Sequence, residues 1–252
     1  FPIVGSLWNK KYRIDGKEYS LEQHGFARDM DFHLVSSDEN TLWYELKSDA
    51  ETLAKYPYAF TLKIGYKLTS NKIQVMWEVS NNDNKTMYFQ IGAHPAFYYP
   101  DFNPDTEERG AFRLYKRGEN GEMKPLETLK YILISEKGCA DTEHVYELET
   151  PEGKLPLTTS TFDHDALIIE NQQVSKVVLE SCAGEPFVSV EFDTPALGMW
   201  SPAGLNAPFV CIEPWYGRCD RKGFTGQLKE KDLVNALAPG QVFRAGYTIE
   251  VF

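Results

Sequence analysis

The chain has 252 residues, of which 42% are hydrophobic and 25% charged, a composition typical of a soluble globular protein. Its formal net charge of −11 argues against nucleic acid as a partner, because such binding depends on clustered lysine and arginine that neutralise phosphates. No apolar run approaches the ~20 residues that a membrane span requires, so we expect no membrane partner. Four cysteines without a C-x-x-C pair indicate free thiols in a reducing compartment, which predicts a cytoplasmic protein.

The first third of the chain predicts strands interrupted by one short helix. Asp15-Gly16 is a strong hairpin dipeptide. Ser48–Lys55 is the helix candidate, with Ser48 or Asp49 as its cap and Pro57 beyond its end. Apolar and polar residues alternate, or β-branched and aromatic residues gather, in the expected strands: Lys10–Lys17, Asp31–Ser36, Leu42–Lys47, Phe60–Lys67, Lys72–Val79 and Met87–Ile91.

The rest of the chain predicts more short strands separated by polar turns. These strands are Phe112–Tyr115, Tyr131–Ile134, Asp165–Glu170, Lys176–Glu180, Phe187–Phe192, Leu197–Trp200, Pro208–Ile212 and Tyr247–Phe252. Glu119–Thr128 and Lys137–Leu157 show no clear pattern, and Lys229–Leu237 predicts a short helix or a turn. About fifteen short strands with frequent turn signals predict an all-β sandwich or closed barrel. Without a repeat or linker, residues 1–252 predict a single domain.

The start of the chain predicts that a segment of the full protein is missing. The numbered sequence begins at Phe1, and FPIVG resembles the end of a structural element. We therefore expect the full protein to contain an additional N-terminal segment.

His94 lies in the motif GAHPAF. Pro95 fixes the backbone beyond it, and Gly92 permits close approach of another segment. The aromatic run 97–99 offers flat faces of the kind that stack on sugar rings. Because histidine titrates near neutral pH, His94 is a candidate acid or base. The alternative is a strand-end histidine that is hydrogen-bonded to the backbone.

Glu213 lies in the motif CIEPWYG. Carboxylates rarely lie within apolar strands unless they are paired or functional. The apolar neighbours Ile212, Pro214 and Trp215 are expected to exclude water and raise the carboxyl pKa, which suits a general base. The alternative is a strand-end glutamate that is paired with Arg218.

His24 and Arg28 share the motif HGFARD. Gly25 predicts a turn there, so that both side chains can face one pocket. The alternative is a surface loop in which Arg28 is paired with Asp29 or Asp31.

The motif FDHDAL contains Asp163, His164 and Asp165 immediately before a predicted strand. Most such clusters are solvated turns, although an aspartate there can accept hydrogen bonds from sugar hydroxyls. No His-x-His or His-x-x-x-His pair is present, so no metal site is expected. The chain also lacks the glycine-rich phosphate loops and the G-x-S-x-G motif, and no cofactor is predicted.

Together these motifs resemble the aldose 1-epimerase (galactose mutarotase) family, in particular its bacterial LacX-type branch and next the hexose-6-phosphate 1-epimerases. The matching segments run in family order: FPIVGSL, QHGFARD, IGAHPAF, HDALI, LGMWSPAG, CIEPWYG and LAPGQVF…YTIEVF. The resemblance implies an antiparallel β supersandwich with an open sugar cleft. Family members carry further residues ahead of the FPIVG segment.

The resemblance also implies residue roles. Glu213 matches the base that takes the proton from the anomeric hydroxyl, and His94 matches the acid that protonates the ring oxygen. His24 matches a second histidine near the same atoms, and Arg28 an arginine offered to the ligand. Asp165 best matches the aspartate that binds sugar hydroxyls.

Asp163 is close enough in the same motif to be the alternative aspartate. The aromatic side chains expected to contact sugar are Phe26, Trp200 and Trp215, together with Tyr98 if the protein only binds carbohydrate.

The expected activity is therefore interconversion of the α and β anomers of an aldohexose. A hexose-6-phosphate 1-epimerase and a non-catalytic carbohydrate-binding protein remain as alternatives. The expected ligand is a hexose or hexose phosphate, and either a monomer or a homodimer is consistent with the sequence.

Overall fold

Hairpins with tight turns build much of the structure, a computed structural model that describes residues 1–252. Strands β1 (Lys11–Ile14) and β2 (Lys17–Ser20) pair across Asp15-Gly16. The φ angles of these two turn residues are 49° and 78°, and such left-handed values at both positions match the twist of the flanking strands. The hairpin predicted from this dipeptide is confirmed.

The chain forms two compact units. Unit 1 comprises Phe1–Gly92, Ser135–Ala140 and Tyr216–Tyr247, and unit 2 comprises Ala93–Ile134, Asp141–Trp215 and Thr248–Phe252. The single domain expected over residues 1–252 stays a prediction.

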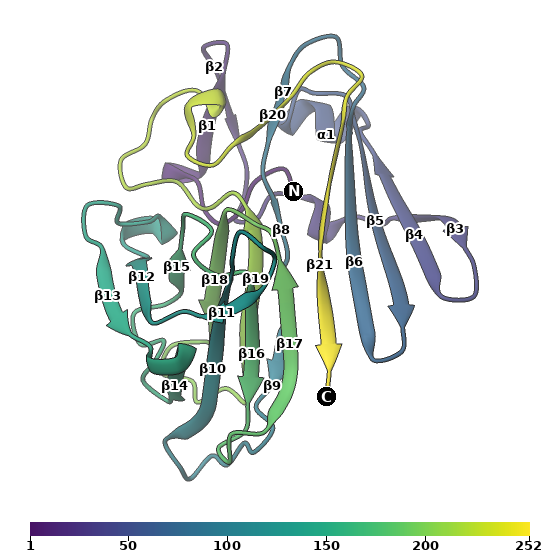
Figure 1. Cartoon of the computed structure of the whole chain (residues 1–252). Coiled ribbons are helices and arrows are strands. Elements are labelled where there is room, and N and C mark those ends of the chain that lie inside the picture. The colour runs from purple at the N-terminus through teal and green to yellow at the C-terminus, as the bar shows by residue number, and fades with distance from the viewer. The chain divides into compact units, whose positions relative to one another are not determined.

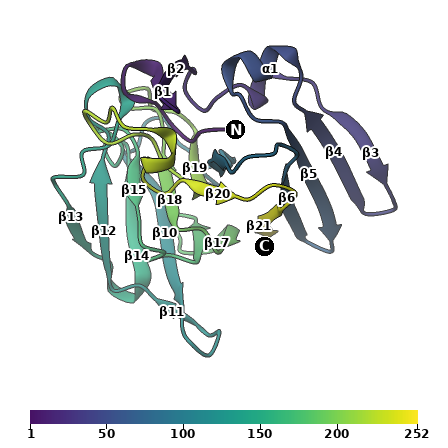
Figure 2. The ribbon, with the colours of Figure 1, turned by 90° about the horizontal axis from the view of Figure 1, so that it is seen from above.

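The main sheet of unit 1 is antiparallel, with the strand order β21-β6-β5-β4-β3. Figures 1 and 2 show its long strands side by side. Their bounds are β3 (His33–Ser37), β4 (Thr41–Lys47), β5 (Phe60–Thr69), β6 (Lys72–Asn81) and β21 (Val242–Val251), of which the residues up to Tyr247 belong to unit 1. The predicted positions of β3 to β6 are confirmed.

The only α-helix, α1 (Ala50–Lys55), connects β4 to β5. The side chain of Asp49 accepts a hydrogen bond from the backbone N–H of Thr52, and the Thr52 hydroxyl accepts one from the backbone N–H of Asp49. This reciprocal cap satisfies donors that the first helical turn leaves free, and it confirms the predicted helix. The helix is too short to cross a lipid bilayer, and no longer apolar helix is present.

The remaining strands of unit 1 are short. They are β7 (Met87–Phe89), β8 (Ile91–Gly92) and β20 (Asn235–Leu237). β20 pairs with β7, so the end of Lys229–Leu237 is a strand, and only a 3₁₀ turn at Leu228–Glu230 is helical. The side chain of Asn235 donates to the carbonyls of Phe89 and Tyr216, contacts that no local pattern reveals.

Unit 2 contains two antiparallel sets of strands. The first has the order β11-β10-β16-β17, with β14 also paired with β10. Its bounds are β10 (Glu108–Arg117), β11 (Met123–Pro125), β14 (Lys154–Thr158), β16 (Lys176–Glu180) and β17 (Pro186–Phe192). β11 and β14 lie in segments whose sequence shows no clear strand pattern. Both strands are short, and each pairs with only part of β10.

The second set in unit 2 has the order β13-β12-β15-β18-β19, and β9 pairs with β19. Its bounds are β9 (Ala96–Tyr98), β12 (Thr128–Leu133), β13 (Tyr146–Glu149), β15 (Leu167–Ile169), β18 (Ala196–Trp200) and β19 (Phe209–Tyr216). The central strands are almost wholly buried. The all-β, antiparallel fold predicted from the sequence is confirmed.

Short 3₁₀ turns complete the structure. They lie at Trp8–Lys10, Ala27–Asp29, Glu136–Gly138 and Pro151–Gly153, in addition to the turn that precedes β20.

In unit 1, breaking a buried ion pair is expected to reduce stability more than breaking an exposed one. Lys231 Nζ lies 2.6 Å from Asp220 Oδ1, and both side chains are 1% exposed. Because Lys231→Met leaves a buried carboxylate without its cation, we expect a loss of ~3–5 kcal/mol in the free energy of unfolding. Lys10→Met breaks an exposed pair with Glu22, so it is expected to lose at most ~1 kcal/mol.

Urea unfolding of the two variants and the wild type, at an unchanged m value, measures both losses. Equal losses for the two variants would contradict this prediction.

Candidate active site

Three alternate residues lie on one face of β19. Successive side chains of a strand point to opposite faces, so Cys211, Glu213 and Trp215 share one face. In the antiparallel register with β18, Gly198 lies opposite Glu213 and Ala196 opposite Trp215. These two small residues leave room beside the larger side chains of β19.

β19 runs further than predicted, because Pro214 does not end it. The Pro214 carbonyl accepts a hydrogen bond from the N–H of Ala93. The N and O of a strand residue point to the same side, so the missing N–H of Pro214 faces Ala93 rather than β18. The loss of one donor therefore leaves the pairing with β18 intact, and Glu213 lies within the strand rather than at its end.

His94 reaches the same face from the segment before β9. Ala96 pairs with Cys211 in the register of β9 and β19, and the Pro95 carbonyl accepts from the N–H of Ile212. This places His94 beside Glu213, with 3.4 Å between His94 Nε2 and Glu213 Oε1. The His94 side chain is 44% exposed and that of Glu213 only 3%, so the pair joins a solvent-accessible imidazole to a buried carboxyl.

The surroundings of Glu213 set its proton affinity. Burial raises the pKa of the carboxyl well above its usual range, and the negative charge of Asp165 raises it further, whereas a hydrogen bond from Trp215 lowers it. The pKa increase expected from apolar neighbours is thus found. Arg218, the alternative partner, forms an ion pair with Asp232 at 2.8 Å.

Two tryptophans flank this pair in different ways. The ring of Trp200 lies edge-on to His94, with 5.4 Å between ring centroids and an interplanar angle of 86°. Trp215 is only 6% exposed, and its indole covers Gly198, where an added Cβ would lie 2.3 Å from two ring carbons. Trp215 is therefore packed against the backbone with little exposed surface, and its contact with sugar stays a prediction.

Within the FDHDAL motif, Asp163, His164 and Asp165 are exposed in the turn that precedes β15. Asp165 has a left-handed backbone with φ of 71°, and its side chain accepts a hydrogen bond from the N–H of Ala166 at 2.7 Å. Between the two candidate aspartates, Asp165 is the one whose charge acts on Glu213. The preference for Asp165 over Asp163 rests on this interaction.

The other predicted site residues belong to unit 1. His24 lies in a turn with φ of 64°, and its Nδ1 accepts from the N–H of Gly5 at 3.2 Å. Arg28 is 55% exposed, 3.5 Å from Asp29, as in the surface-loop alternative. Arg28 also lines a pocket of about 480 Å³ whose other walls include Tyr44 and Trp77.

Phe26 has a packing role in unit 1. It is buried, and its ring contacts those of Phe1, Tyr56 and Phe60. The contact of Phe26 with sugar that the sequence suggested stays a prediction.

Cys211 is a neighbour of the pair that sequence reasoning overlooked. Donor atoms of His94, Cys211 and Glu213 lie within 4.8 Å of one another, and the C-x-E spacing on a strand was the available signal. A metal would require a thiolate and a carboxylate, yet burial raises the Cys211 pKa to about 12 and that of Glu213 well above normal. The chemistry of this set therefore fits a resident metal poorly.

Because its carboxyl is buried, Glu213 is expected to lower the stability of the folded protein at alkaline pH. Because its pKa is raised on folding, the folded state binds the proton more tightly, and stability falls as pH rises from the unfolded pKa of ~4.3 through the folded pKa. We expect Glu213→Gln to raise the melting temperature at pH 8 by ~2–4 °C or more. The gain should vanish near pH 4, where the wild-type carboxyl is protonated in both states.

Thermal unfolding of both proteins from pH 4 to pH 8 measures this difference. A Gln variant that is less stable than the wild type at pH 8 but not at pH 4 would contradict the sign.

Comparisons with known proteins identify the family of the chain. The Aldose 1-epimerase family matches residues 4–226. The chain is 30% identical over 258 aligned positions to "Protein LacX, chromosomal" of Lactococcus lactis subsp. lactis, covering 100% of this chain and 83% of that protein.

Solved structures show the same fold. A galactose mutarotase related enzyme from Lactobacillus acidophilus has a TM-score of 0.89 and 33% identity, covering 100% of this chain and 81% of that one. A galactose mutarotase-like protein from Lactobacillus casei has a TM-score of 0.88 and 27% identity, covering 100% and 83%. The chain therefore belongs to the aldose 1-epimerase family, with a galactose mutarotase-like fold.

Proposed function

We propose that the protein is an aldose 1-epimerase that interconverts the α and β anomers of an aldohexose. The observation that carries this proposal is the distance of 3.4 Å between His94 Nε2 and Glu213 Oε1. In the ring form of an aldose, the anomeric oxygen O1 and the ring oxygen O5 are bonded to the same carbon. An acid and a base that serve these two atoms must therefore lie close together.

Glu213 acts as the base and His94 as the acid in this proposal. The Glu213 carboxylate takes the proton from O1, while the His94 imidazolium gives a proton to O5 and the C1–O5 bond breaks. The open aldehyde rotates about the C1–C2 bond and closes on its other face. Closure reverses both proton transfers, so the enzyme returns to its starting state without a metal or nucleotide.

The environment of each group suits its role. A carboxyl pKa raised by burial brings the base closer to the working pH, which favours proton transfer in both directions. The partial exposure of His94 leaves its ring accessible to a ligand. Trp200, at the edge of His94, is the aromatic side chain that we assign to the sugar.

Three further residues complete the proposal. Asp165 is assigned to the sugar hydroxyls, because its charge already reaches Glu213. His24 and Arg28, both in unit 1, are assigned to the ligand from the family resemblance. The proposed location is cytoplasmic, and the proposed partner is a small-molecule sugar.

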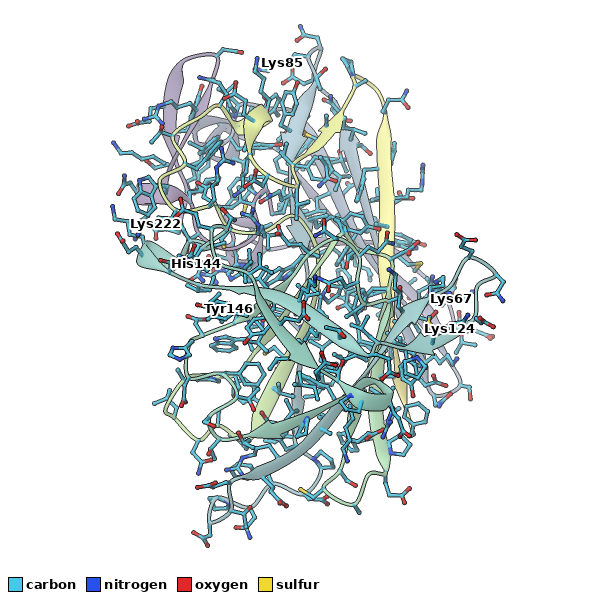
Figure 3. The ribbon with its side chains drawn as sticks, turned by 60° about the vertical axis from the view of Figure 1, so that its left-hand side comes forward. Lys67, Lys85, Lys124, His144, Tyr146 and Lys222 are labelled. Carbon is cyan, nitrogen blue, oxygen red and sulfur yellow. The ribbon has the colours of Figure 1, made fainter.

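Loss of the base should abolish catalysis. We expect wild-type protein to accelerate the mutarotation of fresh α-D-galactose or α-D-glucose, followed by polarimetry. Glu213→Gln and His94→Gln should each lower the rate by ~10²–10⁴-fold, the usual contribution of general acid or base catalysis. His144→Gln is the matched control, because His144 precedes β13 at the surface (Figure 3) and its side chain is 67% exposed.

Unchanged rates in the Glu213 variant would overturn the proposed mechanism. Sugar binding by wild-type protein without any acceleration would instead identify a carbohydrate-binding protein.

The exposure of Arg28 favours a second candidate function, that of a hexose-6-phosphate 1-epimerase. The Arg28 side chain is 55% exposed and lies 3.5 Å from Asp29, so it is accessible to a phosphate, for which arginine is a strong partner. If the substrate is phosphorylated, glucose 6-phosphate should raise the melting temperature more than glucose at equal concentration. In Arg28→Gln this difference should disappear.

An equal shift for the two ligands in the wild type would exclude the phosphosugar candidate.

A further inference from the structure

The carboxyl of Glu213 is surrounded by groups from several elements. The titratable groups that face it are His94 from the segment before β9, Asp165 from the turn before β15 and Cys211 from β19 itself. Across the strand pair, the opposite position is Gly198, which has no side chain to orient it. Trp215, two residues further on the same face, is the neutral hydrogen-bond donor to this carboxyl.

The position of the Trp215 indole is fixed by packing. Trp215 is 6% exposed, and its ring lies directly over the backbone of Gly198. A Cβ at position 198 would lie 2.3 Å from two atoms of the six-membered ring and 3.0 Å from a third, closer than side chains approach. Only glycine at this position lets the indole turn back toward Glu213.

We propose that Trp215 is a positioning residue whose indole N–H holds the Glu213 carboxylate beside His94, and that Gly198 is the backbone gap that permits this placement. The inference rests on the proposed epimerase function. Indole nitrogen can only donate a hydrogen bond, so it interacts with the ionised carboxylate and opposes the effect of burial. The same hydrogen bond thus fixes the direction of the base and keeps it available.

Positioning and sugar stacking predict different kinetic effects. A residue that stacks on sugar in the ground state and the transition state alike changes KM when it is removed, whereas one that orients the base changes kcat. Trp215→Phe keeps an aromatic ring but loses the N–H. We expect it to lower kcat by ~10–100-fold, the usual range for a hydrogen bond to a charged group, with little change in KM.

The pH profile provides a readout that a merely structural role would not move. Without the donor, the ionised form of Glu213 is less favoured, so the acid limb of kcat/KM should shift to higher pH by about one unit. Trp200→Phe is the matched control, because Trp200 contacts His94 and belongs to the proposed sugar contacts. It is expected to raise KM and to leave the acid limb in place.

Two further variants keep the test valid if Trp215→Phe is unstable. Replacing Trp215 by 3-benzothienylalanine exchanges the N–H for sulfur and preserves the ring shape, so packing is retained and only the donor is lost. It should reproduce both the loss in kcat and the shifted acid limb. Gly198→Ala changes no site side chain chemically but displaces the Trp215 indole, and it should change kcat in the same direction.

The outcomes separate this inference from the proposed function. If the wild type is active and Glu213→Gln is inactive, the proposed function stands. A benzothienyl variant with wild-type kcat and acid limb would then overturn the positioning role alone, and a change confined to KM would return Trp215 to the sugar contacts. A wild type without mutarotase activity would overturn the proposed function first.

Discussion

A carboxyl group buried within an apolar strand is the constraint on which the candidate site depends. Glu213 lies in β19 with 3% of its side chain exposed, and burying a charge there is unfavourable unless neighbouring groups compensate. The compensation is specific and incomplete: one hydrogen bond from Trp215 and an imidazole at 3.4 Å, opposed by the charge of Asp165. Such a group is a poor stabilising element and a suitable base.

The surrounding strands make this environment possible. The register of β18 and β19 sets Gly198 opposite Glu213, which gives the Trp215 ring its place. Pro95 and Pro214 lie where the segment that contains His94 runs beside β19. Neither proline has a backbone N–H to donate. The segment has no strand structure at His94, and the imidazole lies beside the carboxyl.

Much of the fold could be predicted because its signals are local. The Asp15-Gly16 turn and the Asp49 cap each depend on a few adjacent residues, and both predictions are confirmed. β11 and β13 each pair with a strand that comes shortly before them in the chain, but both are short and mostly polar, so no apolar alternation reveals them. β19 continues past Pro214 only because the missing donor faces away from β18.

The site was predictable only in part, because it depends on contacts between residues that are far apart in the sequence. His94 and Glu213 are separated by more than a hundred residues, and their proximity was expected from the family resemblance rather than from either motif. The structure brings them together. The burial of Trp215 depends on a glycine in the neighbouring strand, so its residue type alone suggested a sugar contact instead.

The most direct test of this account is the titration of the Glu213 carboxyl by carbon NMR. Protein labelled with glutamate that is ¹³C-enriched at the side-chain carboxyl is compared with the Glu213→Gln variant, which identifies the signal. A buried base predicts a midpoint well above ~4.3, the ordinary value for glutamate. A midpoint at or below that value would show that Glu213 is an ordinary ionised side chain and would contradict its role as a buried base.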